Sequence, residues 1–255
     1  MRKIYQKNWH GISLTDFSHV LNNDNLPGAE FYDQFYKKFN KKYTEIDKLD
    51  NNWLLLKKNA ANFILDILES NDNPSVLSIG SGIGVIEKEL YSKCNIDLHV
   101  QEVSEAPLKF LRRILPKENI HVGYFPDSMK VKKEFDFVIL GGIEYVFTDQ
   151  EFINFVNDVK CFLKPDGVLI ILSWSLYEES FMISLREIIK SILLRLKIIQ
   201  ISGQFWGYLR TEKELTQLVK KSGFDKKSFI IDRNIKPWTT FMATYKKSHL
   251  IKSKN

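Results

Sequence analysis

From residue 74 onward, short runs of apolar and β-branched residues alternate with longer amphipathic segments of helical length. This alternation is typical of a parallel sheet whose strands are joined by helices on its faces. The expected strands are Val76–Ile79, Asp97–Gln101, Ile120–Tyr124, Phe135–Leu140, Val168–Trp174, Phe229–Asp232 and Thr239–Tyr245. The expected helices are Ile83–Ser92, Glu105–Leu115, Asp149–Leu163, Glu178–Ile199 and Thr211–Ser222. The pattern therefore predicts the α/β fold class.

Particular residues define some of these boundaries. Phe135–Leu140 is almost continuously apolar, which indicates a central strand covered on both faces. Lys164-Pro165-Asp166-Gly167 is expected to end a helix and begin a strand, because proline cannot extend a helix and Asp-Gly favours a tight turn. Thr211 and Glu214 have the spacing of a capping box, and Ser222-Gly223 is expected to close the same helix.

Residues 1–73 lack this alternation and mix aromatic residues with lysine and asparagine. Helical runs are expected at Phe31–Asn40 and from Asn52 to Glu69. We interpret residues 1–73 as an N-terminal helical cap on a domain that spans residues 74–245. That domain is expected to carry an insert near 175–210, and residues 246–255 form a basic tail.

The composition is that of a globular protein with one sizeable core, because 44% of the 255 residues are hydrophobic and 27% are charged. Cys94 and Cys161 have no CxxC neighbour, so neither a disulfide framework nor a metal site is predicted. The N-terminus lacks the apolar run of a signal peptide, which favours a cytoplasmic protein. The apolar stretch from Phe181 to Ile199 contains five charged residues, which argues against a membrane span.

The formal net charge of +6 belongs to the two ends of the chain. The basic residues at these ends are Arg2, Lys3, Lys7, Lys246, Lys247, Lys252 and Lys254. Without them, residues 11–245 hold 30 basic and 31 acidic residues, a net charge of −1. We expect these ends to be flexible and predict neither a nucleic-acid nor a membrane partner. The helix at Glu178–Ile199, apolar around most of its circumference, is expected to pack in the core or in a homodimer.

Three glycines stand between the first expected strand and the helix that follows it. Gly80, Gly82 and Gly84 permit a sharp turn and a close approach of the backbone to a nucleotide-sized ligand. The glycine spacing alone is equally compatible with a turn that merely packs well. About twenty residues later the second strand ends at Glu102, whose carboxylate is suited to accept hydrogen bonds from the two hydroxyls of a ribose.

A resemblance to a known family is carried by four stretches, namely Val76–Glu87, Glu102–Ser104, Phe135–Gly142 and Phe162–Leu169. Over about residues 53–245 the chain resembles the class I S-adenosylmethionine-dependent methyltransferases. The resemblance implies a Rossmann-like, seven-stranded, mostly parallel sheet with an antiparallel last strand. It also implies S-adenosyl-L-methionine as cofactor, lying across the carboxyl ends of the first strands. The cofactor-binding residues implied in this way are Ser78, Gly80, Ser81, Gly82, Glu102, Val103, Tyr124, Phe125 and Gly141.

One alternative is a nicotinamide-binding Rossmann domain, which shares the glycine turn and the acid after the second strand. Such domains usually have GxGxxG spacing, whereas Gly80, Gly82 and Gly84 alternate with single residues, and the methyltransferase interpretation is favoured.

The chain departs from the family pattern at two positions. Ser78 stands where the family usually has an acid, and the stretch from Gly123 to Asp127 lacks an Asp at the end of the third strand. Tyr124 or Phe125 is therefore expected to stack on the adenine. A non-catalytic module that binds S-adenosylmethionine remains an alternative.

Glu144 and Tyr145 follow the fourth expected strand, where the resemblance places the methyl-bearing end of the cofactor. Either is a candidate base or substrate ligand, and the alternative is a solvated Glu144 with a packed Tyr145. His10, in the cap, is a candidate base, and His19 is a weaker one. His121 lies on a predicted buried strand and is expected to be structural.

The segment Gln204–Thr211 concentrates aromatic residues just before a helix. As the roof of a pocket it would use Arg210 to hold a phosphate or carboxylate and Tyr208 to donate a hydrogen bond. The alternative is that the aromatic residues cover the edge of the sheet and Arg210 lies on the surface.

The sequence thus predicts a metal-independent methyltransferase that acts on an O or N nucleophile of a small molecule. A phosphate- or sugar-bearing intermediate of surface-polysaccharide or secondary metabolism is the candidate that Arg210 suggests. No two prolines are adjacent, which argues against the Asn-Pro-Pro-Tyr type of amine methylation. An RNA or protein methyltransferase that uses the basic ends is the enzyme alternative.

Overall fold

The computed structural model describes residues 2–22, 25–69, 71–174, 196, 203–234 and 240–248. Apart from residue 196, the predicted helix Glu178–Ile199 lies outside the described residues. Most of the predicted insert near 175–210, Thr239 of the last predicted strand, and residues 249–255 of the predicted tail lie outside them too.

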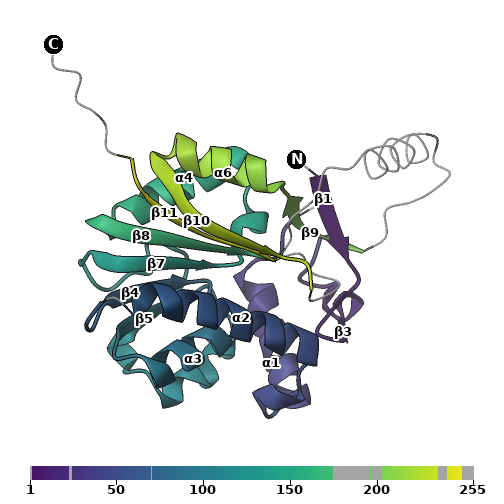
Figure 1. The fold of residues 1–255 in the computed structure, drawn as a ribbon. Helices are drawn as coiled ribbons and strands as arrows, with labels where there is room; N and C mark the ends of the chain where they lie inside the picture. Colours follow the sequence, from purple (N-terminus) through teal and green to yellow (C-terminus); the bar gives the residue numbers. More distant parts are fainter. Residues whose placement is uncertain are drawn as a thin grey trace.

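A seven-stranded sheet forms the centre of the molecule (Figure 1), with the strand order β10-β11-β8-β7-β4-β5-β6. Its strands are β4 Ser75–Ile79, β5 Asp97–Glu102, β6 Ile120–Val122, β7 Phe135–Gly141, β8 Leu163–Ser173, β10 Phe224–Asp232 and β11 Thr240–Lys247. The pairs from β8 to β6 are parallel, whereas β11 is antiparallel to both β8 and β10. The predicted sheet, with its antiparallel last strand, is confirmed.

Helices cover both faces of this sheet (Figure 1). On one face lie α2 Asn51–Leu68 and α3 Val85–Lys93, and on the other lie α4 Asp149–Lys160 and α6 Glu212–Lys221. Ala60, Ile64 and Leu68 of α2 are fully buried in the same core as Val76 and Leu98 of the sheet. The helix α2 therefore packs with the sheet, and the cap that was predicted for residues 1–73 ends before it.

The sequence had predicted a helical cap, but the N-terminal residues form strands as well as helices. The strand β1 Arg2–Gln6 pairs antiparallel with β9 Gln204–Leu209, and β2 Asn8–Trp9 pairs with β3 Ile12–Ser13. The short helix η1 Leu14–Phe17, the helix α1 Ala29–Lys42 and the short helix η2 Ile46–Lys48 follow. Elements β1 to η2 and the strand β9 are called the cap below; they gather beside one end of the sheet (Figure 1).

The expectation that the basic N-terminal end is flexible was wrong. Arg2 and Lys3 lie in β1, where Arg2 pairs with Leu209 and Lys3 with Tyr208. The hairpin between β2 and β3 turns through His10 and Gly11, whose φ angles of 47° and 65° fit a type I′ turn. A partner strand about 200 residues away cannot be recognised from a five-residue pattern.

The helix that was predicted at Glu105–Leu115 is replaced by two single turns, η3 Ala106–Lys109 and η4 Leu111–Arg113. Pro107 has no backbone N–H to donate. The carbonyl oxygen of Ala106 accepts a hydrogen bond from the Asn40 side chain at 2.9 Å. A further turn, η5 Lys117–Asn119, precedes β6.

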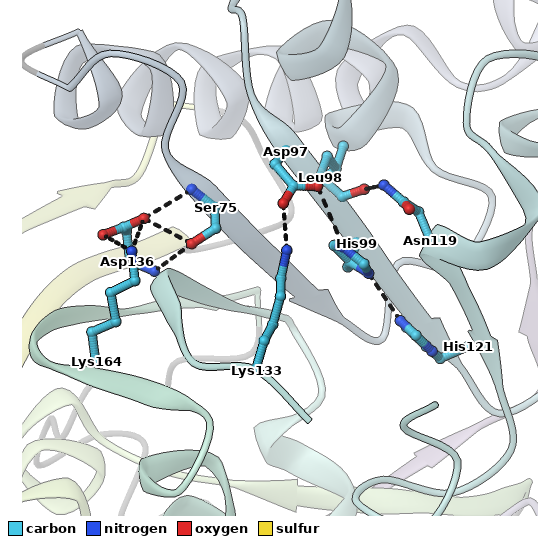
Figure 2. A network of polar contacts seen from close by, with 9 residues as sticks. All are labelled: Ser75, Asp97, Leu98, His99, Asn119, His121, Lys133, Asp136 and Lys164. Carbon is cyan, nitrogen blue, oxygen red and sulfur yellow. Dashed lines mark hydrogen bonds and ion pairs between the residues drawn. The ribbon is translucent and has the colours of Figure 1, made fainter. Parts of the chain in front are cut away.

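The strand β8 begins five residues earlier than predicted because the Pro-Asp-Gly segment forms a bulge inside it. Phe135 pairs with Leu163 and Phe137 with Val168, so Lys164–Gly167 has no register partner in β7. Figure 2 shows the contacts that hold the bulge, in which Nζ of Lys164 lies 2.9 Å from both carboxylate oxygens of Asp136. Asp136 also accepts a hydrogen bond from the hydroxyl of Ser75 in β4.

Two stacked imidazoles join β5 to β6, as Figure 2 also shows. Nδ1 of His99 lies 3.1 Å from Nε2 of His121, and His121 Nδ1 accepts the backbone N–H of Lys130. The imidazole of His99 also lies 3.3 Å from the carboxylate of Asp97. His121 is fully buried and bonded on both ring nitrogens, which agrees with its predicted structural role. None of the described helices is both long and apolar enough to cross a membrane.

Candidate active site

A cavity of about 720 Å³ lies where the glycine loop, the carboxyl ends of the sheet strands and the cap meet. Its floor includes residues that follow β4, β5 and β7, and its walls include side chains of α1, α2 and β9. Every predicted cofactor residue except Ser78 lines it, namely Gly80, Ser81, Gly82, Glu102, Val103, Tyr124, Phe125 and Gly141. Among the predicted catalytic residues, Tyr145 and His10 line it.

The three glycines of the loop serve different purposes. All have positive φ, at 74° for Gly80, 56° for Gly82 and 74° for Gly84. A Cβ on Gly80 would lie 2.3 Å from Ile143, and one on Gly84 would lie 2.3 Å from Leu111, so these two positions allow close packing. A Cβ on Gly82 would meet only the hydroxyl of Tyr36, at 3.5 Å. The backbone of Gly82 is thus the part of the loop that a ligand can approach.

The carboxylate of Glu102 faces this loop from the end of β5. Its Oε2 accepts the N–H of Gly82 at 2.8 Å, and its Oε1 accepts the N–H of Val103 at 2.9 Å. Burial raises the pKa of Glu102 to about 7, although these backbone hydrogen bonds act in the opposite direction. The neighbouring hydroxyl of Ser81 is buried and has no hydrogen-bond partner among the described residues. Glu102 and Ser81 therefore offer polar atoms to a ligand at the loop.

Ser78 contacts an acid that the sequence analysis did not single out. Its hydroxyl donates a hydrogen bond of 2.6 Å to Glu87 Oε1, and Glu87 is buried in the first turn of α3. Burial raises the pKa of Glu87, opposed by the hydrogen bond from Ser78 and the charge of Lys57. The carboxylate at the base of the glycine loop therefore belongs to Glu87 of α3 and not to a residue of β4. The sequence feature that could have indicated Glu87 is its place as an acid in the first turn of the helix that follows the glycines.

Lys57 of α2 is the other residue that the sequence analysis missed. It is half-buried and lines the cavity, and its ammonium lies 4.1 Å from the ring centroid of Trp174 and 5.4 Å from that of Trp53. Burial lowers the pKa of Lys57 to about 8, while the charges of Glu87 and Glu144 raise it. A lysine on an amphipathic helix usually points to solvent, and only the packing of α2 reveals this one.

Tyr124 and Phe125 follow β6, which ends at Val122. Tyr124 is 64% exposed, and its hydroxyl accepts the backbone N–H of Ala29 at 3.3 Å. The ring of Phe125 packs against Phe155, with centroids 5.5 Å apart. The two aromatic rings that were predicted to meet an adenine both border the cavity.

Tyr145 lines the cavity as a hydrogen-bonded phenol. Its hydroxyl contacts Tyr32 of α1 and the indole of Trp206 of β9. Burial raises the pKa of Tyr145 well above its usual range, so the phenol stays protonated. Tyr145 can therefore donate a hydrogen bond but is unsuited to act as a base.

Glu144 is buried, and neither alternative from the sequence analysis describes its position. It begins the turn η6 Glu144–Val146, does not line the cavity, and accepts a hydrogen bond from Ser173. Its Oε2 has no hydrogen-bond partner among the described residues. Burial raises the pKa of Glu144 to about 7. A direct contact with a substrate in the cavity is therefore not supported for Glu144, and it is not solvated either.

The prediction that Arg210 holds a substrate anion was wrong. Arg210 is 3% exposed and does not line the cavity. Its guanidinium donates to the backbone carbonyls of Glu144 at 2.7 Å and Phe147 at 2.5 Å, and to the carboxylate of Asp149 at 3.0 Å. Because these acceptors all belong to the segment after β7, Arg210 anchors that segment to the end of β9.

Tyr208 also faces away from the cavity, where its ring packs 5.3 Å from that of Phe205. The residues of β9 that line the cavity are Trp206 and Leu209. The register of β9 against β1 shifts between Phe205 and Gly207, so the regular alternation of side chains along β9 is interrupted at Trp206. The predicted roof therefore exists, but it uses different residues of the same segment.

His10 lines the cavity from the hairpin turn of the cap. Its ring lies 5.0 Å from Trp53 and 5.4 Å from Phe39. Burial lowers the pKa of His10 to about 4, so the imidazole is neutral near pH 7. His19 lies outside the cavity and contacts Gln34 at 2.7 Å.

Several solved structures have this arrangement of strands and helices. Magnesium protoporphyrin IX methyltransferase from Synechocystis PCC 6803, with bound S-adenosylhomocysteine, has a TM-score of 0.62 and 10% identity, covering 86% of this chain and 98% of its own. Burkholderia thailandensis 1,6-didemethyltoxoflavin-N1-methyltransferase, with 1,6-didemethyltoxoflavin and S-adenosylhomocysteine, has a TM-score of 0.55 and 14% identity, covering 89% and 94%.

A third, an S-adenosylmethionine-dependent methyltransferase from Clostridium acetobutylicum, has a TM-score of 0.54 and 13% identity, covering 84% of this chain and 99% of its own. Neither a protein family model nor a curated protein matches the sequence. The chain thus has the class I methyltransferase fold.

Proposed function

We propose that the protein is an S-adenosyl-L-methionine-dependent methyltransferase that acts on a small molecule. The observation that carries the proposal is the position of Glu102. Its carboxylate lies at the end of β5, 2.8 Å from the N–H of Gly82, at a glycine loop that opens into a cavity. A buried acid in this position suits the two hydroxyls of a ribose.

The other residues around the loop fit the same cofactor. The unpartnered hydroxyl of Ser81 offers a hydrogen bond, and the open space at Gly82 admits a ligand to the backbone. The rings of Tyr124 and Phe125 provide an apolar surface for an adenine. Glu87, held by Ser78, supplies the acid that β4 lacks.

When bound, the cofactor supplies a methyl group on a positively charged sulfur, which is a good leaving group. The protein then has mainly to hold the acceptor atom in line with that methyl group, and such positioning contributes about 7–11 kcal/mol in favourable cases. Tyr145 donates a hydrogen bond to the acceptor from the cavity wall. His10 and Tyr145 are weak bases near pH 7, since the pKa of His10 is about 4 and the Tyr145 phenol stays protonated. Neither residue is therefore suited to take a proton from the acceptor near pH 7.

The size of the site supports a compact acceptor. A volume of about 720 Å³ lies within the range of roughly 300–1,000 Å³ that is typical of small-molecule sites. The cap encloses it on the side away from the sheet. A phosphate-bearing acceptor would need another ligand than Arg210, whose donors are engaged with the segment after β7.

Calorimetry with S-adenosylmethionine, S-adenosylhomocysteine and NAD tests the proposal. We expect one molar equivalent of either adenosyl compound to bind and NAD to give no heat. Binding of NAD alone would refute the proposal. Transfer of a tritium-labelled methyl group into small-molecule extracts, rather than into RNA or protein fractions, tests the acceptor class.

A further inference from the structure

The ammonium of Lys57 lines the cavity and has no hydrogen-bond acceptor in the described part of the chain. Among the described residues it makes ring contacts with Trp53 and Trp174, and no carboxylate lies within ion-pair distance of it. It is also the one Lys or Arg side chain that lines the cavity in the described part of the chain. An ammonium carries three N–H donors, so a half-buried one that bonds none of them to a described residue favours a ligand that supplies acceptors.

The acids of the cavity differ from Lys57 because they already have donors. The carboxylate of Glu87 accepts the hydroxyl of Ser78, and that of Glu102 accepts the N–H groups of Gly82 and Val103. Each of these two carboxylates thus accepts at least one hydrogen bond, whereas the Lys57 ammonium donates none to a described residue. A cationic ligand group placed beside Lys57 would be repelled, and an anionic one would be attracted.

Flat aromatic side chains surround this ammonium. Four of the five tryptophans of the chain line the cavity, namely Trp9, Trp53, Trp174 and Trp206. Trp174 contacts the ammonium of Lys57, which also contacts Trp53. Ring contacts then join Trp53 to His10 at 5.0 Å, His10 to Trp9 at 5.3 Å and Trp9 to Trp206 at 5.2 Å, so these rings form an aromatic wall. Such a wall suits a planar ring, which gains both apolar burial and stacking.

The position of Lys57 separates it from the predicted ribose site. Trp174, the ring nearest to the ammonium, directly follows β8, whereas Glu102 ends β5. Between these strands lie β7 and β4, so Trp174 and Glu102 follow strands that are three strand spacings apart in the sheet, roughly 14 Å. Lys57, beside Trp174, and Glu102 therefore lie at the ends of different strands, and both line the cavity.

We propose that the methyl acceptor is a planar aromatic acid whose anionic group binds Lys57 and whose ring lies against the tryptophan wall. The inference rests on the proposed methyltransferase function. An adjacent ammonium also stabilises the anion of a carboxylate or phenol. The carboxylate of the cofactor itself is the rival occupant of Lys57, and the experiment separates the two.

The test uses three probes that share one ring: para-hydroxybenzoate, para-hydroxybenzamide and para-hydroxybenzylamine. Binding to protein saturated with S-adenosylhomocysteine is followed by tryptophan fluorescence. We expect the carboxylate to bind about tenfold or more tighter than the neutral amide, and the amine to bind most weakly. Lys57→Gln should abolish this order, and Lys57→Arg should retain it. Lys58→Gln, on an exposed neighbour in the same helix, is the matched control.

Other outcomes overturn the inference. It fails if none of the three rings binds, if the amine binds most tightly, or if Lys57→Gln leaves the preference for the carboxylate intact. It also fails if Lys57→Gln weakens S-adenosylhomocysteine alone and leaves the order of the probes unchanged, since Lys57 then serves the cofactor. Failure of the proposed function gives a different result, because S-adenosylhomocysteine would then not bind the unaltered protein.

Discussion

Glu102 combines two properties that make its ionisation visible in ligand binding. Its carboxylate lies at the predicted ribose site, and burial raises its pKa to about 7 in the free protein. Ribose hydroxyls bind the ionised form more strongly than the protonated form. Ligand binding should therefore pull a proton off Glu102 at neutral pH.

We predict that the affinity for S-adenosylhomocysteine rises with pH between about 6 and 8, by up to roughly tenfold per pH unit below the pKa. Glu102→Gln should weaken binding by about tenfold or more and remove this pH dependence, because an amide does not ionise. Calorimetry at three pH values measures both effects. Glu89→Gln, in an exposed ion pair with Lys93, should retain the slope. An equal slope in Glu102→Gln would disprove the assignment.

Ser78 and Glu87 form a buried pair whose loss should appear in stability. Removing the hydroxyl leaves a buried carboxylate without its side-chain donor, so Ser78→Ala should lower the free energy of unfolding by about 1–3 kcal/mol. In a Glu87→Gln background the same substitution should cost less, because a neutral amide is less costly to bury. Urea unfolding of the four proteins of this cycle gives the coupling energy. Ser92→Ala, at an exposed hydroxyl, should change stability by less than about 0.5 kcal/mol.

Sequence reasoning found the residues whose role follows from their place along one strand and loop. Gly80, Gly82 and Glu102 were predicted in this way, because a glycine turn after a strand and an acid after the next strand must meet at one edge of the sheet. Lys57 and Glu87 were missed because their roles depend on how α2 and α3 pack against the loop. The sequence predicts the helices α2 and α3, but it does not show which of their side chains face the glycine loop.

At the level of elements, β9 and the segment after β7 depend on one another through Arg210. A Cβ on Gly207 of β9 would lie 2.3 Å from the carbonyl oxygen of Tyr145, so the two segments are in backbone contact. Arg210 then closes the junction by bonding the carbonyls of Glu144 and Phe147. The segment that presents Tyr145 to the cavity is thereby fixed from outside.

We predict that Arg210→Ala destabilises the protein by about 3–5 kcal/mol, because buried carbonyls and one carboxylate lose their charged donor. Arg210→Lys should recover only part of this loss, since an ammonium lacks the planar fork of a guanidinium. Thermal and urea unfolding measure the difference. Arg112→Ala, in an exposed ion pair with Glu105, should cost less than about 1 kcal/mol. If Arg210→Ala unfolded like the unaltered protein and only bound ligands more weakly, the anchoring role would be incorrect.

Elements with local signals were predicted well, and those with distant partners were not. The capping box of Thr211 and Glu214 is present as expected, and it begins α6. The pairing of β1 with β9 has no such local signal, because each segment is extended through its hydrogen bonds to the other, which is distant in sequence. Where a helix was predicted at Glu105–Leu115, the carbonyl of Ala106 accepts a hydrogen bond from Asn40, which lies far away along the chain.

For the whole molecule, the charge distribution and the fold give a consistent picture. Arg2 and Lys3 belong to β1, and Lys246 and Lys247 lie in β11, so these four positive charges are part of the folded structure. Part of the positive charge that was predicted to lie in flexible ends therefore lies in the strands β1 and β11. The interior of the cavity nevertheless contains acids and a single lysine in the described part of the chain, which differs from a basic nucleic-acid groove.

Buried carboxyl groups and imidazoles have opposite effects on how the free energy of unfolding depends on pH. In the described part of the chain, buried carboxyls with a raised pKa are Glu87, Glu102 and Glu144. Imidazoles with a lowered pKa are His10, His99 and His121. The carboxyls protonate in the folded state before they do in the unfolded state, so their contribution to stability increases as the pH falls from 7. The imidazoles protonate first in the unfolded state, so their contribution decreases as the pH falls through 6.5.

We therefore predict that the free energy of unfolding changes little between about pH 6.5 and 4.5, and that single substitutions expose the two slopes. Glu144→Gln removes a stabilising proton uptake, so acidification should destabilise this variant by up to about 1.4 kcal/mol per pH unit more than the unaltered protein. His121→Gln removes the opposing contribution and should tilt the dependence the other way. Urea unfolding at several pH values gives both slopes. Because His121 is bonded to His99 and Lys130, its variant should also lose stability at pH 7, whereas parallel slopes in all three proteins would show that these groups are not held in the states assigned to them.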